Sequence, residues 1–473
     1  MNNRKTRVEN DSMGPMTVPF DAYHGASTAR SLANFQISPL RLFPEQIHAM
    51  VALKLACAKA NMELGLLPKR KGDAIIRACR EVRAGRFDAE FGLDVFQSGS
   101  GTSTNMNVNE VVANRASELL GGRRGSKRVH PNDDVNMGQS TNNIFPSSIR
   151  VAATPLLLTL IKAAENFSKT LAQKGKEFDR VIKSGRTHLQ DAVPIRMGQV
   201  FNAFSRSIRK DAERLRLKIR HVSELGAGGN AVGTGINTHP SFRKRIIKNL
   251  NAELGSKMFR VAPDGVEATH STNDLADLSG AVQTLAVDVA RICNDIRLMA
   301  SGPLTGLNEL RLPPVEPGSS IMPGKINPSI CEAVNMACLR VFGNHHTVTL
   351  SAMSAQLELN VTMPVTAYAL LESLKIMASA VATLDEKCVA GLEANKEQCM
   401  AYAMASPSLA TFLNPVIGYE KSASIVKKAL AEKKTIPQVV LEQGILTKEE
   451  LRIIFDPARL TSPEIYKKGK IDR

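Results

Sequence analysis

The sequence predicts a mainly α-helical protein organised around a central bundle of five long helices. Aromatic residues make up only 4% of the chain and tryptophan is absent, so the apolar 43% consists largely of Leu, Ile, Val, Ala and Met. A core of such side chains favours helices packed on helices over a β-sandwich. The 473 residues also exceed one ordinary core, which predicts two or three domains or one very elongated domain. After residue 145, apolar residues recur with helical spacing in one long stretch after another.

These patterns divide the chain into three parts. Helical spacing appears at 45–65 and 73–84, and glycines interrupt the rest of the N-terminal region. We expect an N-terminal domain at 1–140, a bundle domain at 141–395 and a small C-terminal helical domain at 396–473.

The bundle domain is predicted to contain five helices of roughly 40 Å each, at about 1.5 Å per residue. Their ranges are 145–175, 196–224, 271–300, 329–352 and 363–392. In the third helix, apolar residues alternate in spacings of three and four, which is typical of a coiled-coil seam. The seam consists of Leu275, Leu278, Val282, Leu285, Val289, Ile292, Ile296 and Met299. Apolar residues such as Val287 fall on other faces, so we expect several chains to pack their bundles together.

The C-terminal domain is predicted to hold short helices at 419–432, 436–443 and 447–454, separated by Pro and Gly turns. Thr447 precedes the last of these helices and Glu450 follows three residues later, a pattern that predicts a capping box.

The net charge of +16 is compatible with nucleic-acid binding. However, Lys and Arg are spread along the chain, and their densest groups, at 69–71, 123–128 and 243–245, are not interleaved with aromatic residues. We therefore interpret the charge as a solvated surface whose positive field attracts a small dianion, and we predict no nucleic-acid partner.

Several other classes of protein are disfavoured. There is no run of 18 apolar residues and no secretory signal, so no membrane span is predicted. The seven cysteines form no C-x-x-C pair, which favours free thiols in a reducing cytoplasm. His345 and His346 have no carboxylate or Cys at metal-ligand spacing, so no metal site is predicted. The G-x-G-x-x-A pattern at 226–231 follows helical sequence where a dinucleotide site requires a strand, and we expect no cofactor.

The most informative segment is the loop from Gly318 to Asn327. It combines the hydroxyls of Ser319 and Ser320 with the cation of Lys325, and a helix start follows at residue 329. A serine hydroxyl becomes a useful base only where backbone donors or cations stabilise its alkoxide. The N-terminal amides of the following helix could also face an anion. The segment therefore indicates a base beside an anion clamp, and the alternative is an ordinary Gly/Pro surface loop.

Three further polar segments are candidates for binding or proton transfer. His188, within 185–192, lies between hydroxyl and amide side chains and could shuttle a proton or bind a carboxylate. The 98–107 segment combines glycines with hydroxyl and amide donors, and the 130–143 segment precedes a helix start. Each also has a purely structural interpretation: a satisfied histidine, a polar turn or a helix cap.

Taken together, these segments resemble the fumarase/aspartase superfamily. The signature S-S-x-M-P-x-K-x-N is present from Ser319 to Asn327, and the resemblance covers almost the whole chain. His130-Pro131-Asn132-Asp133 and Pro323-Gly324-Lys325 are similar to the metal-free class II fumarate hydratases, whereas Ser140-Thr141-Asn142 is similar to the aspartases. Asn143 and Asn230 depart from the Asp and Thr usual at these positions.

The resemblance implies a role for each matching residue. Ser319 would remove the proton at C3 of malate, and His188, paired with Glu332, would act on the opposite face. The implied carboxylate-binding residues are Ser100, Gly101, Thr102, Ser140, Thr141, Asn142, Thr187, Ser320, Lys325 and Asn327. A secondary anion site would consist of His130, Asn132 and Asp133.

The resemblance also implies an assembly and a reaction. The family is homotetrameric, with a 20-helix core and active sites built from segments of three subunits. The implied reaction is reversible hydration of fumarate to (S)-malate by anti addition, through an aci-carboxylate intermediate, without metal or cofactor. Two alternatives stand beside it: elimination of ammonia from aspartate, and a non-catalytic scaffold or nucleic-acid binder that uses the basic surface.

Overall fold

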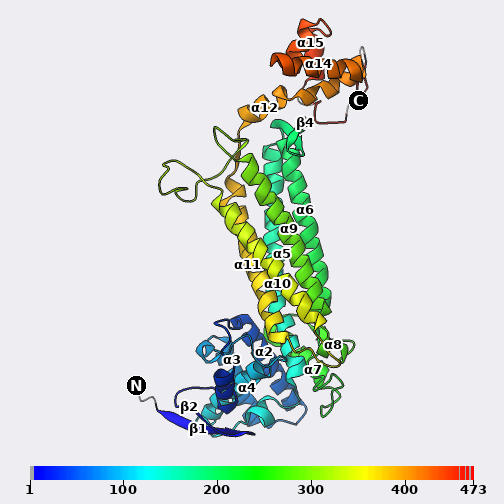
Figure 1. Cartoon of the computed structure of the whole chain (residues 1–473). Helices are drawn as coiled ribbons and strands as arrows, with labels where there is room; N and C mark the ends of the chain where they lie inside the picture. Colours follow the sequence, from blue (N-terminus) through cyan, green and yellow to red (C-terminus); the bar gives the residue numbers. More distant parts are fainter. Residues whose placement is uncertain (1–4, 457–458, 464, 468–469, 473) are drawn as a thin grey trace. The chain divides into compact units, whose positions relative to one another are not determined.

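The computed structural model confirms the mainly helical architecture (Figure 1). It describes residues 5–456, 459–463, 465–467 and 470–472. The chain forms two compact units. Unit 1 comprises 1–162, 213–286 and 339–378, and unit 2 comprises 163–212, 287–338 and 379–473. The predicted division into three domains at 140 and 395 stays a prediction.

The five predicted bundle helices are present with closely similar bounds. They are α5 (Thr141–Glu177), α6 (Met197–Val222), α9 (Asn273–Met299), α10 (Ser329–Met353) and α11 (Met363–Lys387). Each unit contains segments of all five helices, packed as a helical bundle (Figure 1). Every residue of the predicted α9 seam is buried, so the alternating spacing identified the core-facing side of that helix.

The N-terminal part of unit 1 is more regular than the sequence predicted. The expected helices are α2 (Pro44–Glu63) and α3 (Lys69–Arg83). The additional elements are a hairpin of β1 (Thr6–Asp11) and β2 (Gly14–Pro19), and the helices α1 (Ala26–Asn34) and α4 (Thr102–Leu119). Because α4 is rich in Asn, Thr and Val, its intrinsic helix propensity is weak. Burial of most of its residues against neighbouring elements stabilises it instead.

Shorter elements complete unit 1. They are η1 (Asp88–Glu90), the π-helical turn η2 (Pro131–Val135), α7 (Phe242–Leu254), α8 (Glu267–His270), and the parallel pair of β5 (Glu224–Leu225) and β6 (Arg260–Val261). The unpredicted helix α7 packs against α2, and a buried apolar stripe that includes Phe242 and Ile246 explains why it forms.

Unit 2 carries a hairpin of β3 (Ile182–Thr187) and β4 (Gln190–Arg196), and the short pair of β7 (Leu310–Arg311) and β8 (Glu393–Ala394). Its C-terminal elements are η3 (Val389–Gly391), α12 (Lys396–Ala405), η4 (Pro407–Leu413), α13 (Asn414–Ile417), α14 (Tyr419–Glu432), α15 (Ile436–Glu442), α16 (Lys448–Ile454), β9 (Ile465–Lys467) and β10 (Lys470–Asp472).

The three predicted C-terminal helices correspond to α14, α15 and α16 and pack around one apolar cluster. The capping box at Thr447 is confirmed, since Glu450 N donates to Thr447 Oγ1 at 3.1 Å and Thr447 N donates to Glu450 Oε2 at 2.9 Å. A second box, formed by Thr435 and Gln438, was not predicted.

Two helical stretches, 141–177 and 363–391, are long and apolar enough to cross a membrane by composition alone. In both stretches the most apolar window is at least half buried inside the fold, at 78% and 50% of its residues. Core helices of a large bundle meet the same criteria, so this property is weak evidence for a membrane span.

Candidate active site

The predicted site residues fall into two groups, one in each unit. The unit 1 group contains Ser100, Gly101, Thr102, His130, Asn132, Asp133, Ser140, Thr141 and Asn142. The unit 2 group contains Thr187, His188, Ser319, Ser320, Lys325, Asn327 and Glu332.

The 318–327 segment is a loop, as predicted, and its base is closed by contacts between its two ends. Gly318 N donates to Lys325 O at 3.0 Å, and the side-chain amide of Asn327 donates to Gly318 O. A Cβ at Gly318 would lie 2.2 Å from Lys325 O, so only glycine fits there. Gly324 adopts a φ of +80°, the left-handed region in which glycine is favoured. The glycines and Asn327 thus shape this loop.

The hydroxyl of Ser319 faces two backbone donors. Ile321 N and Met322 N lie 3.3 and 3.1 Å from Ser319 Oγ, and both donate to it. Two N–H groups aimed at one oxygen stabilise negative charge on that oxygen more than on the neutral hydroxyl. A serine base requires such donors, and the loop's own backbone provides them. Residues 320–326 of the loop, including Ser320 and Lys325, are exposed.

His188 lies at the tip of the β3–β4 hairpin. His188 and Leu189 form its two-residue turn, with φ of +56° and +58°. This geometry is that of a type I′ turn, which normally takes Asn-Gly. Non-glycine residues in this region are strained, and such strain concentrates at functional sites. Both residues are exposed, with 71% of Leu189 accessible, so the turn presents His188 away from the unit 2 core.

A fully buried carboxylate anchors this hairpin. Arg186 Nη1 lies 2.8 Å from Glu309 Oε1, and Lys183 Nζ lies 3.3 Å from Glu309 Oε2. The backbone of Glu309 also receives a hydrogen bond from Asn395 N at 2.9 Å. Glu309 thereby ties the strand that leads to Thr187 and His188 to the chain segment that leads to the 318–327 loop. Sequence reasoning did not identify this residue.

Glu332 is exposed in the first turn of α10, where its charge is favourable near the helix N-terminus. Its carboxylate lies 3.9 Å from the Arg297 guanidinium. Among the described residues, no hydrogen bond or ion pair joins Glu332 to His188 within one chain. Their pairing stays a prediction.

In unit 1, two glycines fix the start of α4. Gly101 has a φ of +87°, and a Cβ there would lie 2.2 Å from the Phe145 ring. Gly99 O accepts from Met363 N at 3.0 Å, and a Cβ at Gly99 would lie 1.9 Å from Val361 O. The Thr102 side chain is exposed at this helix N-terminus, and its Oγ1 lies 2.9 Å from Ser100 Oγ. The segment is therefore the N-terminus of a buried helix, not a flexible polar turn.

The 140–143 segment caps α5. Ser140 O accepts from Ile144 N at 3.1 Å, and Ser140 Oγ accepts from Asn142 N at 3.3 Å. Asn142 Nδ2 donates to Ala231 O at 2.8 Å. The side-chain amide of Asn143 donates to Asn230 O, so the two residues that depart from the family pattern contact each other. An Asp at position 143 has no donor for that carbonyl when ionised, which makes Asn the fitting residue here.

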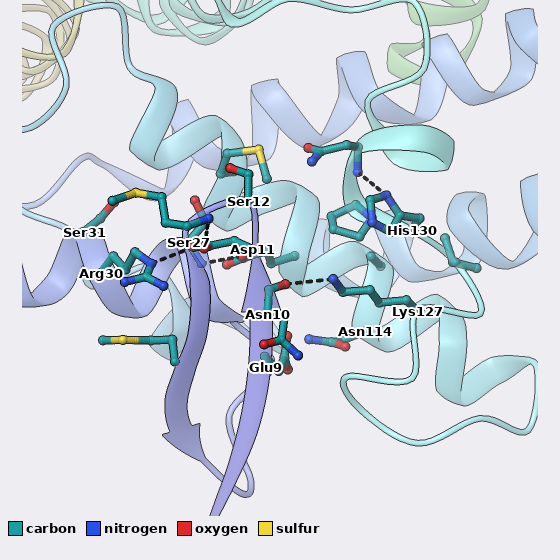
Figure 2. A pocket seen from close by; sticks show the side chains of 18 of the residues that line it. Glu9, Asn10, Asp11, Ser12, Ser27, Arg30, Ser31, Asn114, Lys127 and His130 are labelled. Atoms are coloured by element: carbon teal, nitrogen blue, oxygen red, sulfur yellow. Dashed lines mark hydrogen bonds and ion pairs between the residues drawn. The ribbon is translucent and has the colours of Figure 1, made fainter.

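His130 caps η2 and borders a cavity of about 860 Å³ (Figure 2). Its Nδ1 accepts from Asn132 N at 3.3 Å and Asp133 N at 3.1 Å. An Nδ1 that accepts leaves the proton on Nε2, which is then free to donate to a ligand. Lys127 Nζ, on the same side of the cavity, donates to Asn10 O at 2.8 Å (Figure 2). This arrangement is suited to a secondary anion site.

The sequence also gave no indication of Lys54, which is fully buried in α2 and donates to Asn136 Oδ1 at 2.7 Å. Asn136 lies between η2 and α5, close in sequence to the 140–142 donors. Among the described residues, no group of three His, Cys, Asp or Glu side chains is arranged to hold a metal ion.

Comparison with known proteins identifies two matching family models and close relatives. The lyase family model matches residues 14–343, and a model of the fumarase C C-terminus matches 409–462. A class II fumarate hydratase from Thermus thermophilus is 48% identical, over 97% of this chain and 98% of the relative. An aspartate ammonia-lyase from Helicobacter pylori is 44% identical, over 98% of this chain and 100% of the relative. The crystal structure of the class II fumarase from Schistosoma mansoni matches with a TM-score of 0.93 at 38% identity, covering 96% of this chain and 98% of that one.

Proposed function

Because the chain belongs to the fumarase/aspartase lyase family, we propose that it is a class II fumarate hydratase, which adds water reversibly to fumarate to give (S)-malate. The observation that carries this proposal is the loop in which two backbone amides point at the hydroxyl of Ser319. A base of this kind serves a reaction in which a weakly acidic C–H proton is removed.

The chemistry begins at C3 of malate in the dehydration direction. Deprotonated Ser319 takes a proton from C3, and the electron pair moves into the neighbouring carboxylate to form a dianionic aci-carboxylate. The amides of Ile321 and Met322 stabilise the serine alkoxide before the transfer. Lys325 and Asn327 are assigned to the additional negative charge on the substrate, where each preorganised donor contributes about 3–4 kcal/mol.

The second step breaks the C2–O bond. The electron pair of the aci-carboxylate forms the double bond of fumarate, and the departing hydroxide takes a proton on the opposite face. We assign this proton transfer to His188, acting through water, with Glu332 as its partner. The neutral hydroxyl and amide donors of unit 1 are assigned to the two substrate carboxylates, together with Thr187 and Ser320. Neutral donors bind the ground state less strongly than full charges would, which leaves more stabilisation for the transition state.

We also propose a homotetramer with a 20-helix core. One face of α10 supports this assembly, because exposed residues recur along it in spacings of three and four. These residues are Met336, Leu339, Gly343, His346, Leu350 and Met353. An exposed heptad pattern with four large apolar side chains indicates a helix face that packs against another helix. The exposure of Thr187, His188 and Lys325 in one chain is consistent with active sites completed by neighbouring subunits.

The cytoplasm is the proposed location, since all seven cysteines are free and buried, as expected where thiols stay reduced. We also propose the three-domain division at residues 140 and 395, because it is the arrangement expected of the family.

The direct test is turnover of fumarate, malate and aspartate by the purified protein, followed through fumarate absorbance. We expect rapid interconversion of fumarate and malate and no ammonia-dependent consumption of fumarate. The competing function, aspartate ammonia-lyase, is favoured by the Ser140-Thr141-Asn142 segment and by the 44% identical relative. Release of fumarate from aspartate but not from malate would establish that alternative.

A further inference from the structure

The buried lysine of α2 has no role in the mechanism above, and its surroundings suggest one. Lys54 is 0% exposed. Among the described residues it forms no ion pair, and its ammonium donates to Asn136 Oδ1 at 2.7 Å. A buried cation without a carboxylate partner is costly, so it is rarely retained for stability. Such groups are concentrated at functional sites.

Asn136, the hydrogen-bond partner of Lys54, is the centre of an amide network that joins two predicted substrate-binding segments. Asn105 Nδ2 and Asn109 Nδ2, both in α4, lie 3.4 and 3.2 Å from the same Asn136 Oδ1. Asn136 Nδ2 in turn donates to Gln139 O at 3.0 Å, directly before Ser140. The network therefore links the helix that starts at Thr102 to the turn that presents Ser140, Thr141 and Asn142.

The network also has a consistent polarity. The lysine charge draws the carbonyl end of the Asn136 amide toward itself, which directs the positive N–H end toward the α5 N-terminus. Aligned dipoles of this kind reinforce one another in a low-dielectric interior. The positive end of the α5 dipole lies at the same place. Both effects favour a carboxylate at the 140–142 segment.

We propose that Lys54 is a positioning residue of the dicarboxylate site: its buried positive charge holds Asn136 and favours substrate anion binding at the 140–142 segment. This inference rests on the proposed function for the identity of the ligand. It assigns the charge of Lys54, and not only its volume, to substrate affinity.

The environment of Lys54 makes this effect dependent on pH. Burial lowers the pKa of Lys54 to about 7 and raises the pKa of the neighbouring Cys57 and Cys79 thiols to about 12. The carboxylates on elements packed against α2 are Asp73, Glu81, Glu110, Glu118, Asp133, Asp134 and Glu253. Six of them bind another partner, for example Lys71 with Asp134 at 2.8 Å and Lys59 with Glu253 at 2.9 Å, and the seventh, Asp133, is exposed beside His130. Two histidines also lie in this neighbourhood, His48 on α2 against Asp88 and His130 at the N-cap of η2, and Lys54 is the fully buried group among the three.

The experiment compares the wild type with Lys54→Met and Lys54→Gln across pH 6 to 9, measuring kcat and KM separately. Lys59→Met, the same substitution at a partly exposed lysine on the same helix, is the matched control. At pH 6 we expect KM about tenfold higher in both Lys54 variants with a smaller change in kcat, the size of effect that one unit charge exerts over about 10 Å at an effective dielectric constant of about 20. The difference should disappear by pH 9, where the wild-type lysine is neutral.

An increase in KM that is the same at every pH in both variants, or no increase in KM in either variant, would overturn the proposal. Lys54→Gln keeps a donor for Asn136 without the charge, so it also serves if Lys54→Met does not assemble. Failure of the proposed function would look different. The wild type would then turn over aspartate instead of malate, and the same pH-dependent KM ratio would be expected with aspartate.

Discussion

The proposed donor segments of unit 1 and the proposed reactive loop of unit 2 are built in opposite ways. In unit 1, Thr141 is buried, and a polar network that includes Lys54 joins α4 to Gln139, directly before the 140–142 segment. In unit 2, the 318–327 loop is exposed and holds its shape mainly through contacts within itself. Binding donors placed on rigid helices keep their geometry without ligand, whereas a self-contained loop can move between states at little cost. Substitutions in the two regions should therefore alter different quantities.

The largest effect is expected for Ser319→Ala. Loss of the base should lower kcat by about 10²–10⁴-fold, with KM and oligomeric state nearly unchanged. Initial rates of fumarate hydration and size-exclusion chromatography measure these quantities. Ser354→Ala is the control, because among the described residues that exposed hydroxyl, directly after α10, bonds only Leu350 O in the last turn of the helix. Retention of wild-type kcat in Ser319→Ala would exclude this residue as the base.

The same Gly→Ala substitution should act differently in the two regions. At Gly101, the new Cβ meets the Phe145 ring at 2.2 Å and φ is +87°, so the free energy of unfolding should fall by about 2–4 kcal/mol. At Gly318 the Cβ meets Lys325 O at 2.2 Å in an exposed loop, so we expect about tenfold lower kcat with little change in stability. Denaturant unfolding and steady-state kinetics test both expectations. A large loss of stability in Gly318→Ala would contradict the view of the loop as self-contained.

Thr141→Val tests whether the unit 1 donors act in binding. The substitution keeps the shape of a buried side chain and removes one hydroxyl, at a cost of about 1.5–3 kcal/mol if that hydroxyl binds a carboxylate. KM should therefore rise roughly 10- to 100-fold while kcat changes less. A fall in kcat at constant KM would instead place Thr141 with the reacting groups.

The last prediction concerns how the stability of Lys54→Met depends on pH. The pKa of Lys54 is about 7 in the folded chain and near 10.4 when unfolded, so between these values the unfolded state binds more protons. Wild-type stability should therefore rise with pH in this range, by up to about 1.4 kcal/mol per pH unit. Lys54→Met should lack that slope and be the more stable protein at pH 7. If the free energy of unfolding changed with pH in the same way in both proteins, Lys54 would not be desolvated.

Features that depend on one segment of the chain could be predicted from the sequence, whereas features that depend on distant segments could not. The seam of α9 and the Thr447 cap are readable because their spacing repeats within one segment. Helix α4 was missed because its stability comes from burial of weak helix formers by neighbouring elements.

The site follows the same pattern. The signature segment was predicted to be a loop and is one in the structure, but the amides of Ile321 and Met322 become donors to Ser319 only through the fold of the loop. Lys54 and Glu309 read as ordinary charged residues in sequence. Their burial is decided by elements tens to hundreds of positions away, such as Asn136 for Lys54.

The apolar face of α10 has a consequence for how the protein matures. If the protein forms the proposed homotetramer, a newly folded chain exposes Met336, Leu339, Leu350 and Met353 to water until other chains cover them. Correct association of the chains then competes with aggregation through the same apolar face. The activity recovered after dilution from denaturant should therefore be highest at an intermediate protein concentration. Below that concentration the chains associate too rarely, and above it they aggregate and the solution becomes turbid.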